Sequence, residues 1–324
     1  MVAFTQPERL RPVALRPGDT VGIIAPSGVI DRDALEAGCS WLLQKGFQPF
    51  YLPSIFDREL YFAGNATRRL EEFHEMFARQ EVKAIICARG GYGCNYLLPH
   101  IDLGLVRANP KIFCGCSDVT TLLTYLCDKA GMVTFHGPML NVDVRPDGVD
   151  EASWSAGMMT GDPWQRDFPG GEVETLVPGR AQGMLCGGCL SLLCASLGTP
   201  YEIDTRGTVL FLEDLAEPAF RIDRMLMHLK LAGKFEGVRG IIFGEMLNCG
   251  LRHAGDFTLQ QVVQRVVGDL GIPVVYGLKS GHVTGGNITL PIGVPATLSA
   301  GATVSLALAA SVRDIPAAVP AHTS

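Results

Sequence analysis

The sequence lacks any long apolar run. The apolar segments with the most buried character, at 209–212 and 240–244, are far shorter than the roughly 20 residues that a bilayer-spanning helix needs. Residues 1–18 mix glutamate, arginine and proline, and so lack the uninterrupted apolar stretch of a signal peptide. These absences predict a cytoplasmic protein that does not act at a membrane.

The sequence also lacks a cluster of positive charge. Its formal net charge is −6, and no run of lysine or arginine forms the stripe that a phosphate backbone attracts. We therefore expect no nucleic-acid partner.

A second pair of closely spaced cysteines, as in a zinc finger, is missing as well. The ten cysteines lie mostly inside apolar segments, which is typical of reduced, buried thiols. The single Cys-x-x-Cys, Cys186 to Cys189, has no second pair at zinc-finger spacing, so packing is favoured over a metal or redox role. No metal or cofactor is expected.

The organisation of the chain indicates an α/β protein. The 324 residues, 47% of them apolar, can form about two domains. Short β-branched runs alternate with amphipathic segments from 19 to 140, which predicts a parallel sheet covered on both faces. One helical face carries Leu70, Phe73, Met76 and Phe77. We expect a domain at 1–160, a linker rich in glycine and proline at 161–180, a second domain at 181–324, and a mobile tail from 312.

Two segments end strands of the expected sheet. Residues 89–93 read Arg-Gly-Gly-Tyr-Gly, and Ser117 lies between a strand at 112–114 and a helix at 119–127. A serine at a strand-to-helix corner projects its hydroxyl from the sheet, and the next backbone N–H points to where an oxyanion forms. Ser117 is therefore a candidate nucleophile, with helix capping as the alternative interpretation.

A serine nucleophile needs a base and a carboxylate that orients the base. His282 lies in a glycine-rich loop after a strand, and Glu213 ends the apolar run 209–212. The alternative interpretation of His282 is a polar loop residue, and that of Glu213 is a solvated strand end. His136 follows a short strand and either lines the site or packs beneath it.

The ordered combination of motifs resembles the LD-carboxypeptidases, or muramoyl-tetrapeptide carboxypeptidases. The motifs are Ile-Ala-Pro at 24–26, Arg-Gly-Gly-Tyr-Gly at 89–93, Ser-Asp at 117–118, His-Gly-Pro at 136–138, Phe-Leu-Glu-Asp at 211–214, Arg-Ile-Asp-Arg-Met-Leu at 221–226 and Gly-His at 281–282. The resemblance implies a flavodoxin-like sandwich, similar to class I glutamine amidotransferases, followed by a smaller β/α domain, and a homodimer. The activity it implies removes the terminal D-alanine from the tetrapeptide of recycled murein.

The resemblance also implies the site residues. The catalytic triad is then Ser117, Glu213 and His282, and the backbone N–H groups of Gly91 and Asp118 form the oxyanion hole. The residues themselves add three candidate substrate contacts, Arg89, Gly90 and His136. Arg89 is a donor for the free carboxylate of the peptide, although an arginine at a strand end also serves as a structural partner.

Two departures leave the substrate open. Cys189 replaces a frequent asparagine of the family, and Cys116 replaces an aromatic residue before the serine.

One alternative is a cysteine-dependent hydrolase that uses Cys114 or Cys116. Another is a peptidase of the microcin-immunity type, which cleaves a peptidyl-nucleotide amide and needs an aromatic side chain, such as Trp41, Trp154 or Trp164, to stack on the base. The third residue of the stem peptide is not determined by the sequence.

Overall fold

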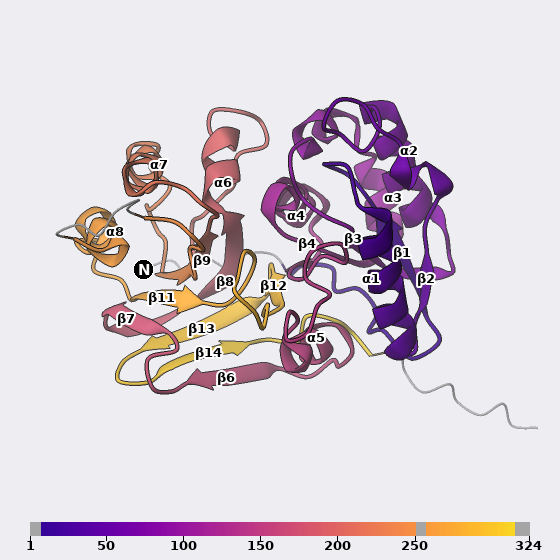
Figure 1. Ribbon diagram of the computed structural model, residues 1–324. Helices are drawn as coiled ribbons and strands as arrows, with labels where there is room; N and C mark the ends of the chain where they lie inside the picture. Colours follow the sequence, from indigo (N-terminus) through magenta and orange to yellow (C-terminus); the bar gives the residue numbers. More distant parts are fainter. Residues whose placement is uncertain (1–7, 251–256, 315–324) are drawn as a thin grey trace, which may run out of the picture.

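The computed structural model describes residues 8–250 and 257–314, which form two β-sheets with helices packed on them (Figure 1). The first sheet has the strand order β12-β5-β4-β3-β1-β2. Strands β1 to β5 pair in parallel, and β12 is antiparallel to β5. Their bounds are Thr20–Ile24 (β1), Gln48–Phe50 (β2), Val82–Cys87 (β3), Ile112–Gly115 (β4), Thr134–His136 (β5) and Leu290–Ile292 (β12).

Amphipathic helices cover this first sheet. They are α1 (Arg32–Gln44), α2 (Ala66–Ala78), α3 (Leu103–Ala108), α4 (Thr120–Tyr125) and α5 (Glu151–Met158). In α2 the predicted apolar face is confirmed, because Phe73, Met76 and Phe77 are fully buried. Asn65 starts this helix by accepting a hydrogen bond from the Arg68 amide, which satisfies an N–H that would otherwise lack a partner.

The second sheet has the order β6-β14-β13-β8-β9-β10-β11-β7. Strands β8 to β11 are parallel, and the outer strands pair in antiparallel fashion. The bounds are Trp164–Phe168 (β6), Glu174–Val177 (β7), Gly179–Cys189 (β8), Thr208–Glu213 (β9), Gly240–Gly244 (β10), Val274–Leu278 (β11), Pro295–Ala300 (β13) and Val304–Leu308 (β14), with helices α6 (Leu190–Ser196), α7 (Ala219–Leu231) and α8 (Leu259–Val267). No helix in the described ranges has the length and apolar character needed to cross a bilayer.

The segment expected as a linker forms two edge strands instead. Strand β6 pairs with β14, and β7 pairs with β11, so 161–180 belongs to the second sheet. Each strand is short and mostly exposed or half-buried, with the sequences Trp-Gln-Arg-Asp-Phe and Glu-Thr-Leu-Val, so its composition resembles that of a linker. With these strands included, the second sheet has eight strands.

The two sheets share one apolar core. Val21 in β1, Phe135 in β5, Leu290 in β12 and Leu185 in β8 belong to the same buried cluster. Strand β12 comes from the C-terminal part of the chain and completes the edge of the first sheet. Val312, at the start of the expected tail, is also buried in this cluster, and 315–324 lie outside the described residues.

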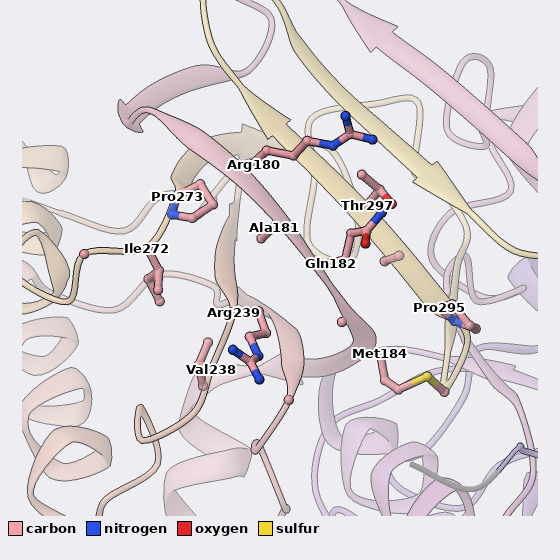
Figure 2. Close-up of a pocket in the computed structure, with 14 residues that line it drawn as sticks. Arg180, Ala181, Gln182, Met184, Val238, Arg239, Ile272, Pro273, Pro295 and Thr297 are labelled. Atoms are coloured by element: carbon pink, nitrogen blue, oxygen red, sulfur yellow. Dashed lines mark hydrogen bonds between the residues drawn. The ribbon is translucent and has the colours of Figure 1, made fainter. Parts of the chain in front are cut away.

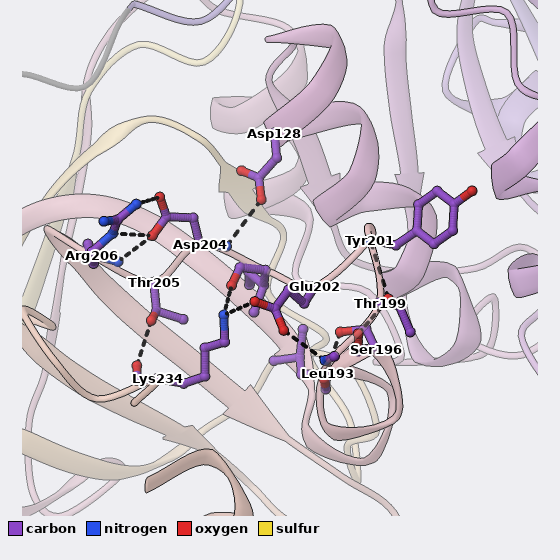
Figure 3. A network of polar contacts seen from close by, with 12 residues as sticks. Asp128, Leu193, Ser196, Thr199, Tyr201, Glu202, Asp204, Thr205, Arg206 and Lys234 are labelled. Carbon is purple, nitrogen blue, oxygen red and sulfur yellow. Dashed lines mark hydrogen bonds and ion pairs between the residues drawn. The ribbon is translucent and has the colours of Figure 1, made fainter. Parts of the chain in front are cut away.

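Polar contacts add to this junction (Figure 3). Asp128, in the π-helical turn η5 (Leu126–Ala130) that follows α4, accepts a 3.4 Å hydrogen bond from the Asp204 amide and pairs with Arg9 at 3.5 Å. Nearby, Lys234 Nζ lies 3.0 Å from Glu202 Oε1. Of these contacts, the hydrogen bond between Asp204 and Asp128 joins the two parts of the chain and adds to the apolar packing between the sheets.

Candidate active site

Ser117 lies on a strained corner at the carboxyl end of β4. Its φ is +61°, a left-handed backbone conformation that residues other than glycine rarely adopt. The short helix η4 (Ser117–Val119) begins here and leads into α4, and neither helix has a side-chain cap at its start. The capping interpretation is therefore wrong, and the corner has the geometry that exposes a nucleophile.

Glycines allow the backbone to approach this corner closely. A Cβ atom on Gly115 would lie 2.8 Å from Val119 Cγ1, and one on Gly90 would lie 2.7 Å from Ser117 Cβ and 2.9 Å from Ser117 Oγ. The latter would also lie 3.4 Å from the Asp118 amide nitrogen. The Gly90 backbone therefore passes directly beside the hydroxyl and the amide of the proposed oxyanion hole.

The Gly91 N–H points away from the neighbouring loop. The Gly28 amide donates a 3.1 Å hydrogen bond to the Gly90 carbonyl, and the C=O and N–H of a trans peptide point in opposite directions. No hydrogen bond uses the Gly91 N–H within the described part of the chain, and its φ of +115° favours glycine. This N–H is thus available to an oxyanion.

A methyl group at Gly90 should impair catalysis without preventing folding. We expect Gly90→Ala to lower kcat by about 10²-fold, since misplacement of a reacting atom by an ångström has effects of that size. The control is Gly157→Ala in α5, where the nearest atom to an added Cβ lies 3.6 Å away. Both melting temperatures should be measured, and a folded Gly90→Ala variant with wild-type kcat would contradict the proposed position of the nucleophile.

Glu213 and His282 meet at the carboxyl ends of the second sheet. Glu213 is the last residue of β9 and is fully buried. Its Oε2 lies 2.7 Å from His282 Nδ1 and accepts a 3.1 Å hydrogen bond from the His282 amide. Because an ionised carboxylate only accepts hydrogen bonds, Nδ1 carries the proton and Nε2 is free to act as a base.

Electrostatics stabilise this pair in its ionised and oriented form. Burial raises the pKa of Glu213, but the interactions with His136 and His282 outweigh burial and lower that pKa to about 2. Burial lowers the pKa of His282, but the hydrogen bond and charge of Glu213 outweigh it, so the pKa is raised above 6.5. Glu213 therefore remains an anion at any pH at which an imidazole titrates.

His136 supports Glu213 from the opposite side. Its side chain is fully buried, with Nε2 3.6 Å from Glu213 Oε1 and Nδ1 3.1 Å from Ser280 Oγ. Its ring also packs edge-on against Phe211, at 5.1 Å between centroids. His136 thus lies behind the carboxylate, in a place that sequence reasoning left open between lining and packing.

The neighbouring carboxylates point elsewhere, as strand alternation predicts. Asp214 accepts a 2.8 Å hydrogen bond from the Ser191 amide at the start of α6. Glu217 pairs with Arg221 at 3.4 Å, four residues later. Glu213 is therefore the carboxylate of this group that contacts His282.

Ser117 and the Glu213–His282 pair come from different sheets but are linked through adjacent residues. Thr120, three residues after Ser117, accepts a 3.0 Å hydrogen bond from the Cys189 amide, and Cys189 pairs with Glu213 across β8 and β9. Helix α4 packs against β8 and α6 at this boundary (Figure 1). Within the described residues no hydrogen bond joins Ser117 to His282.

The guanidinium group of Arg89 uses only part of its hydrogen-bonding capacity within the fold. Its Nη1 donates to the Val29 carbonyl at 2.9 Å, and its Nε is buried without a hydrogen-bond partner among the described residues. The guanidinium thus lies beside the loop at Gly28, at the edge of the corner region.

Several residues around the site were not found from the sequence. Asn287 binds both the N–H and the C=O of Gly281, at 3.0 and 3.1 Å, and so holds the backbone next to His282. Ser27 and Cys94 contact the Asp118 side chain. Asn287 lies six residues after Gly281 in an irregular loop, whereas Ser27 and Cys94 are distant from Asp118 in sequence, and no motif identifies any of the three.

The cysteines near Ser117 are poor nucleophiles. Cys114 and Cys116 are buried, and burial raises the pKa of both thiols, with Asp143 adding to the effect. Since the thiolate is the reactive form, this environment disfavours the cysteine-dependent alternative. In the described part of the chain, no group of three or more His, Cys, Asp or Glu is arranged to hold a metal ion.

A cavity of about 790 Å³ lies at the opposite end of the second sheet (Figure 2). Residues 180–184, at the start of β8, run along it, together with Arg239 before β10 and Pro273 before β11. Ligand sites in parallel sheets lie at the carboxyl ends of the strands, so this cavity is separate from the site at Glu213.

Comparison with known proteins gives the family. Models of the LD-carboxypeptidase N-terminal and C-terminal domains match residues 21–137 and 182–298. A probable murein peptide carboxypeptidase of Bacillus subtilis is 40% identical over 297 residues, which are 89% of this chain and 91% of that protein. The microcin C7 self-immunity protein MccF of Escherichia coli is 29% identical, over 91% of this chain and 94% of that protein.

The fold agrees with this result. The crystal structure of a muramoyltetrapeptide carboxypeptidase from Oxalobacter formigenes has a TM-score of 0.82 and 28% identity, and the match covers 91% of this chain and all of that one. The resemblance drawn from the motifs is confirmed across both sheets. The chain belongs to the LD-carboxypeptidase family of serine peptidases.

Proposed function

We propose that this enzyme hydrolyses the amide bond before the terminal D-alanine of murein tetrapeptides, through a Ser117–Glu213–His282 triad. The observation that carries the proposal is the buried 2.7 Å Glu213–His282 contact, linked through Cys189 and Thr120 to a serine with a φ of +61°. The names of the Bacillus and Oxalobacter relatives support the murein substrate. We further propose that the enzyme works in the cytoplasm, in the recycling of cell-wall fragments, as a homodimer.

The residue types define the steps. His282 Nε2 takes the proton of Ser117 while Oγ attacks the carbonyl that precedes D-alanine, and Glu213 stabilises the imidazolium. The N–H groups of Gly91 and Asp118 stabilise the tetrahedral oxyanion. Collapse of this intermediate breaks the amide bond and passes the proton from His282 to the leaving amine. His282 then takes a proton from water as the water attacks the acyl-enzyme, and it returns this proton to Ser117 Oγ when the shortened peptide leaves.

The substrate ends in a free carboxylate, which needs a cationic partner. Arg89 is the candidate, since one of its buried nitrogens has no hydrogen-bond partner among the described residues and its neighbour Gly90 borders Ser117. We assign Gly90 to backbone contact with the substrate. We assign His136, which is buried behind Glu213, to support of that carboxylate.

The pH profile should reveal the base. The pKa of His282 is raised above 6.5, and only the neutral imidazole accepts the serine proton, so activity should fall as pH drops through this raised value. We expect the acid limb of kcat/KM to be centred above pH 6.5 in the wild type. Glu213→Gln should move the limb to lower pH, because the charge that raises the pKa is lost. An acid limb that stays unchanged in this variant would contradict the assignment of the pair.

A second candidate function rests on the similarity to the microcin C7 self-immunity protein. Trp41 and Trp154 pack edge-on, with ring centroids 5.4 Å apart, in the apolar core that the two sheets share, so these two are committed to packing rather than to a nucleobase. Tyr61 and Tyr92 are exposed, with ring centroids 6.4 Å apart, and Tyr92 directly follows Gly91. This pair supports an aromatic contact for a peptidyl-nucleotide.

One experiment separates the two functions. The purified enzyme is incubated with sugar-free tetrapeptide or with an aminoacyl sulfamoyl-adenosine, and the products are followed by mass spectrometry. We expect rapid loss of one D-alanine from the tetrapeptide and slow cleavage of the nucleotide. The reverse preference would favour the microcin-type function. Loss of activity after thiol alkylation would instead favour a cysteine nucleophile.

A further inference from the structure

The side chain of Asp118 contacts two segments that are distant in sequence. It is fully buried directly after Ser117, and its Oδ2 accepts hydrogen bonds from Ser27 Oγ at 2.6 Å and from the Cys94 amide at 2.9 Å. Ser27 follows β1 and Cys94 follows the glycine-rich loop after β3, so a single carboxylate oxygen joins three strand ends. Burial of a carboxylate is unfavourable unless such bonds compensate for lost hydration.

The loop 90–94 is held at its two ends. At one end, the Gly28 amide binds the Gly90 carbonyl at 3.1 Å. At the other end, Asp118 binds the Cys94 amide, and the buried Arg69 donates a 2.9 Å hydrogen bond to the Gly93 carbonyl. Gly91 lies between these anchors, so the position of its N–H depends on both.

We propose that Asp118 is a positioning residue that sets the spacing between the two oxyanion donors. Its own backbone N–H is one donor, and its carboxylate fixes the loop that carries the other donor, Gly91. An oxyanion hole works because its donors are already in place when charge develops, and a small error in their spacing weakens both hydrogen bonds. This inference rests on the proposed function and adds a residue that acts through the donors.

Two substitutions distinguish positioning from simple stability. Asp118→Ala removes the acceptor for both hydrogen bonds, and kcat on the tetrapeptide should fall by about 10²-fold with little change in KM, as when an oxyanion donor is lost. Asp118→Asn can place its carbonyl oxygen where Oδ2 lies, because both bonds go to that one oxygen. This variant should therefore keep most of kcat. Its NH₂ group replaces Oδ1, which has no hydrogen-bond partner among the described residues, so a buried donor is left unsatisfied and the melting temperature should fall.

Binding measurements give the second readout. A boronic-acid analogue of the tetrapeptide forms a tetrahedral adduct with a catalytic serine and so needs the oxyanion donors. Asp118→Ala should weaken its binding by the same factor as kcat. The Kd of the tetrapeptide itself, measured in the Ser117→Ala background, should not change when Asp118→Ala is added.

Two further variants serve as controls. Ser27→Ala removes one of the two hydrogen bonds and should give the same pattern with a smaller loss of kcat, and it tests the proposal if Asp118→Ala does not fold. Asp128→Asn changes a carboxylate that joins chain segments away from the site, and it should lower stability without changing the ratio of analogue to substrate binding.

The outcomes separate the two proposals. Wild-type kcat in folded Asp118→Ala and Ser27→Ala, with Ser117→Ala inactive, would overturn the role of Asp118 and leave the proposed function intact. Equal weakening of analogue and substrate, or loss of kcat that follows melting temperature in all variants, would also overturn it. Activity in Ser117→Ala would instead overturn the proposed function.

Discussion

Ser117→Ala is expected to lower kcat on the tetrapeptide by about 10³-fold or more, because in the proposed triad the hydroxyl supplies the covalent step and the other two members cannot act without it. The hydroxyl makes no hydrogen bond among the described residues, so removal of its oxygen breaks none. The variant should therefore fold with the wild-type melting temperature. D-alanine release and thermal unfolding are measured on the same preparation.

The opposite result has a clear meaning. A folded Ser117→Ala enzyme that releases D-alanine within about tenfold of the wild-type rate would place the nucleophile elsewhere, since loss of a triad serine has far larger effects. Ser191→Ala is a suitable control, because the Ser191 hydroxyl donates to Asp214, a carboxylate that does not contact His282. It should keep wild-type kcat.

Glu213→Gln is expected to lower kcat by an amount on the order of 10³-fold, since a triad whose carboxylate is replaced by an amide loses the charge that stabilises the imidazolium. The interactions with His136 and His282 lower the pKa of this buried carboxylate to about 2, so Glu213 is an anion throughout the neutral range. Gln has nearly the same shape, so the change removes the charge and one acceptor oxygen of the pair with His282 while keeping the packing. The measurement is kcat on the tetrapeptide at a pH above the acid limb.

Two neighbouring carboxylates are matched controls for this change. Asp214→Asn alters a group that binds the Ser191 amide, and Glu217→Gln alters an exposed pair with Arg221. Both should reduce kcat far less than Glu213→Gln does. If Glu217→Gln is the most damaged and Glu213→Gln resembles the wild type, the third member of the triad has been assigned to the wrong residue.

The sequence predicted the parts of the fold that depend on local pattern. The buried face of α2, the strands that lead to Ser117 and Glu213, and the alternation that turns Asp214 away from His282 follow from periods of 3.6 and 2. The edge strands β6 and β7 were missed, because they gain their stability from β14 and β11, which lie far along the chain. Their own residues resemble a linker.

The remainder of the site depends on contacts that no local pattern encodes. The close approach of Gly90 to Ser117 arises from the pairing of β3 with β4. The bonds from Ser27 and Cys94 to Asp118 join three strand ends, and the buried position of His136 follows from its pairing with β12. Such contacts appear only when the sheets are assembled.

The most direct test of the account is covalent labelling of the nucleophile. A fluorophosphonate transfers its phosphonyl group to an activated serine, and peptide mapping then locates the adduct. We predict one adduct per chain, on Ser117, and loss of labelling in His282→Ala. An adduct on another residue, or labelling of Ser117 that does not depend on His282, would contradict the claim that this serine and histidine form the catalytic pair.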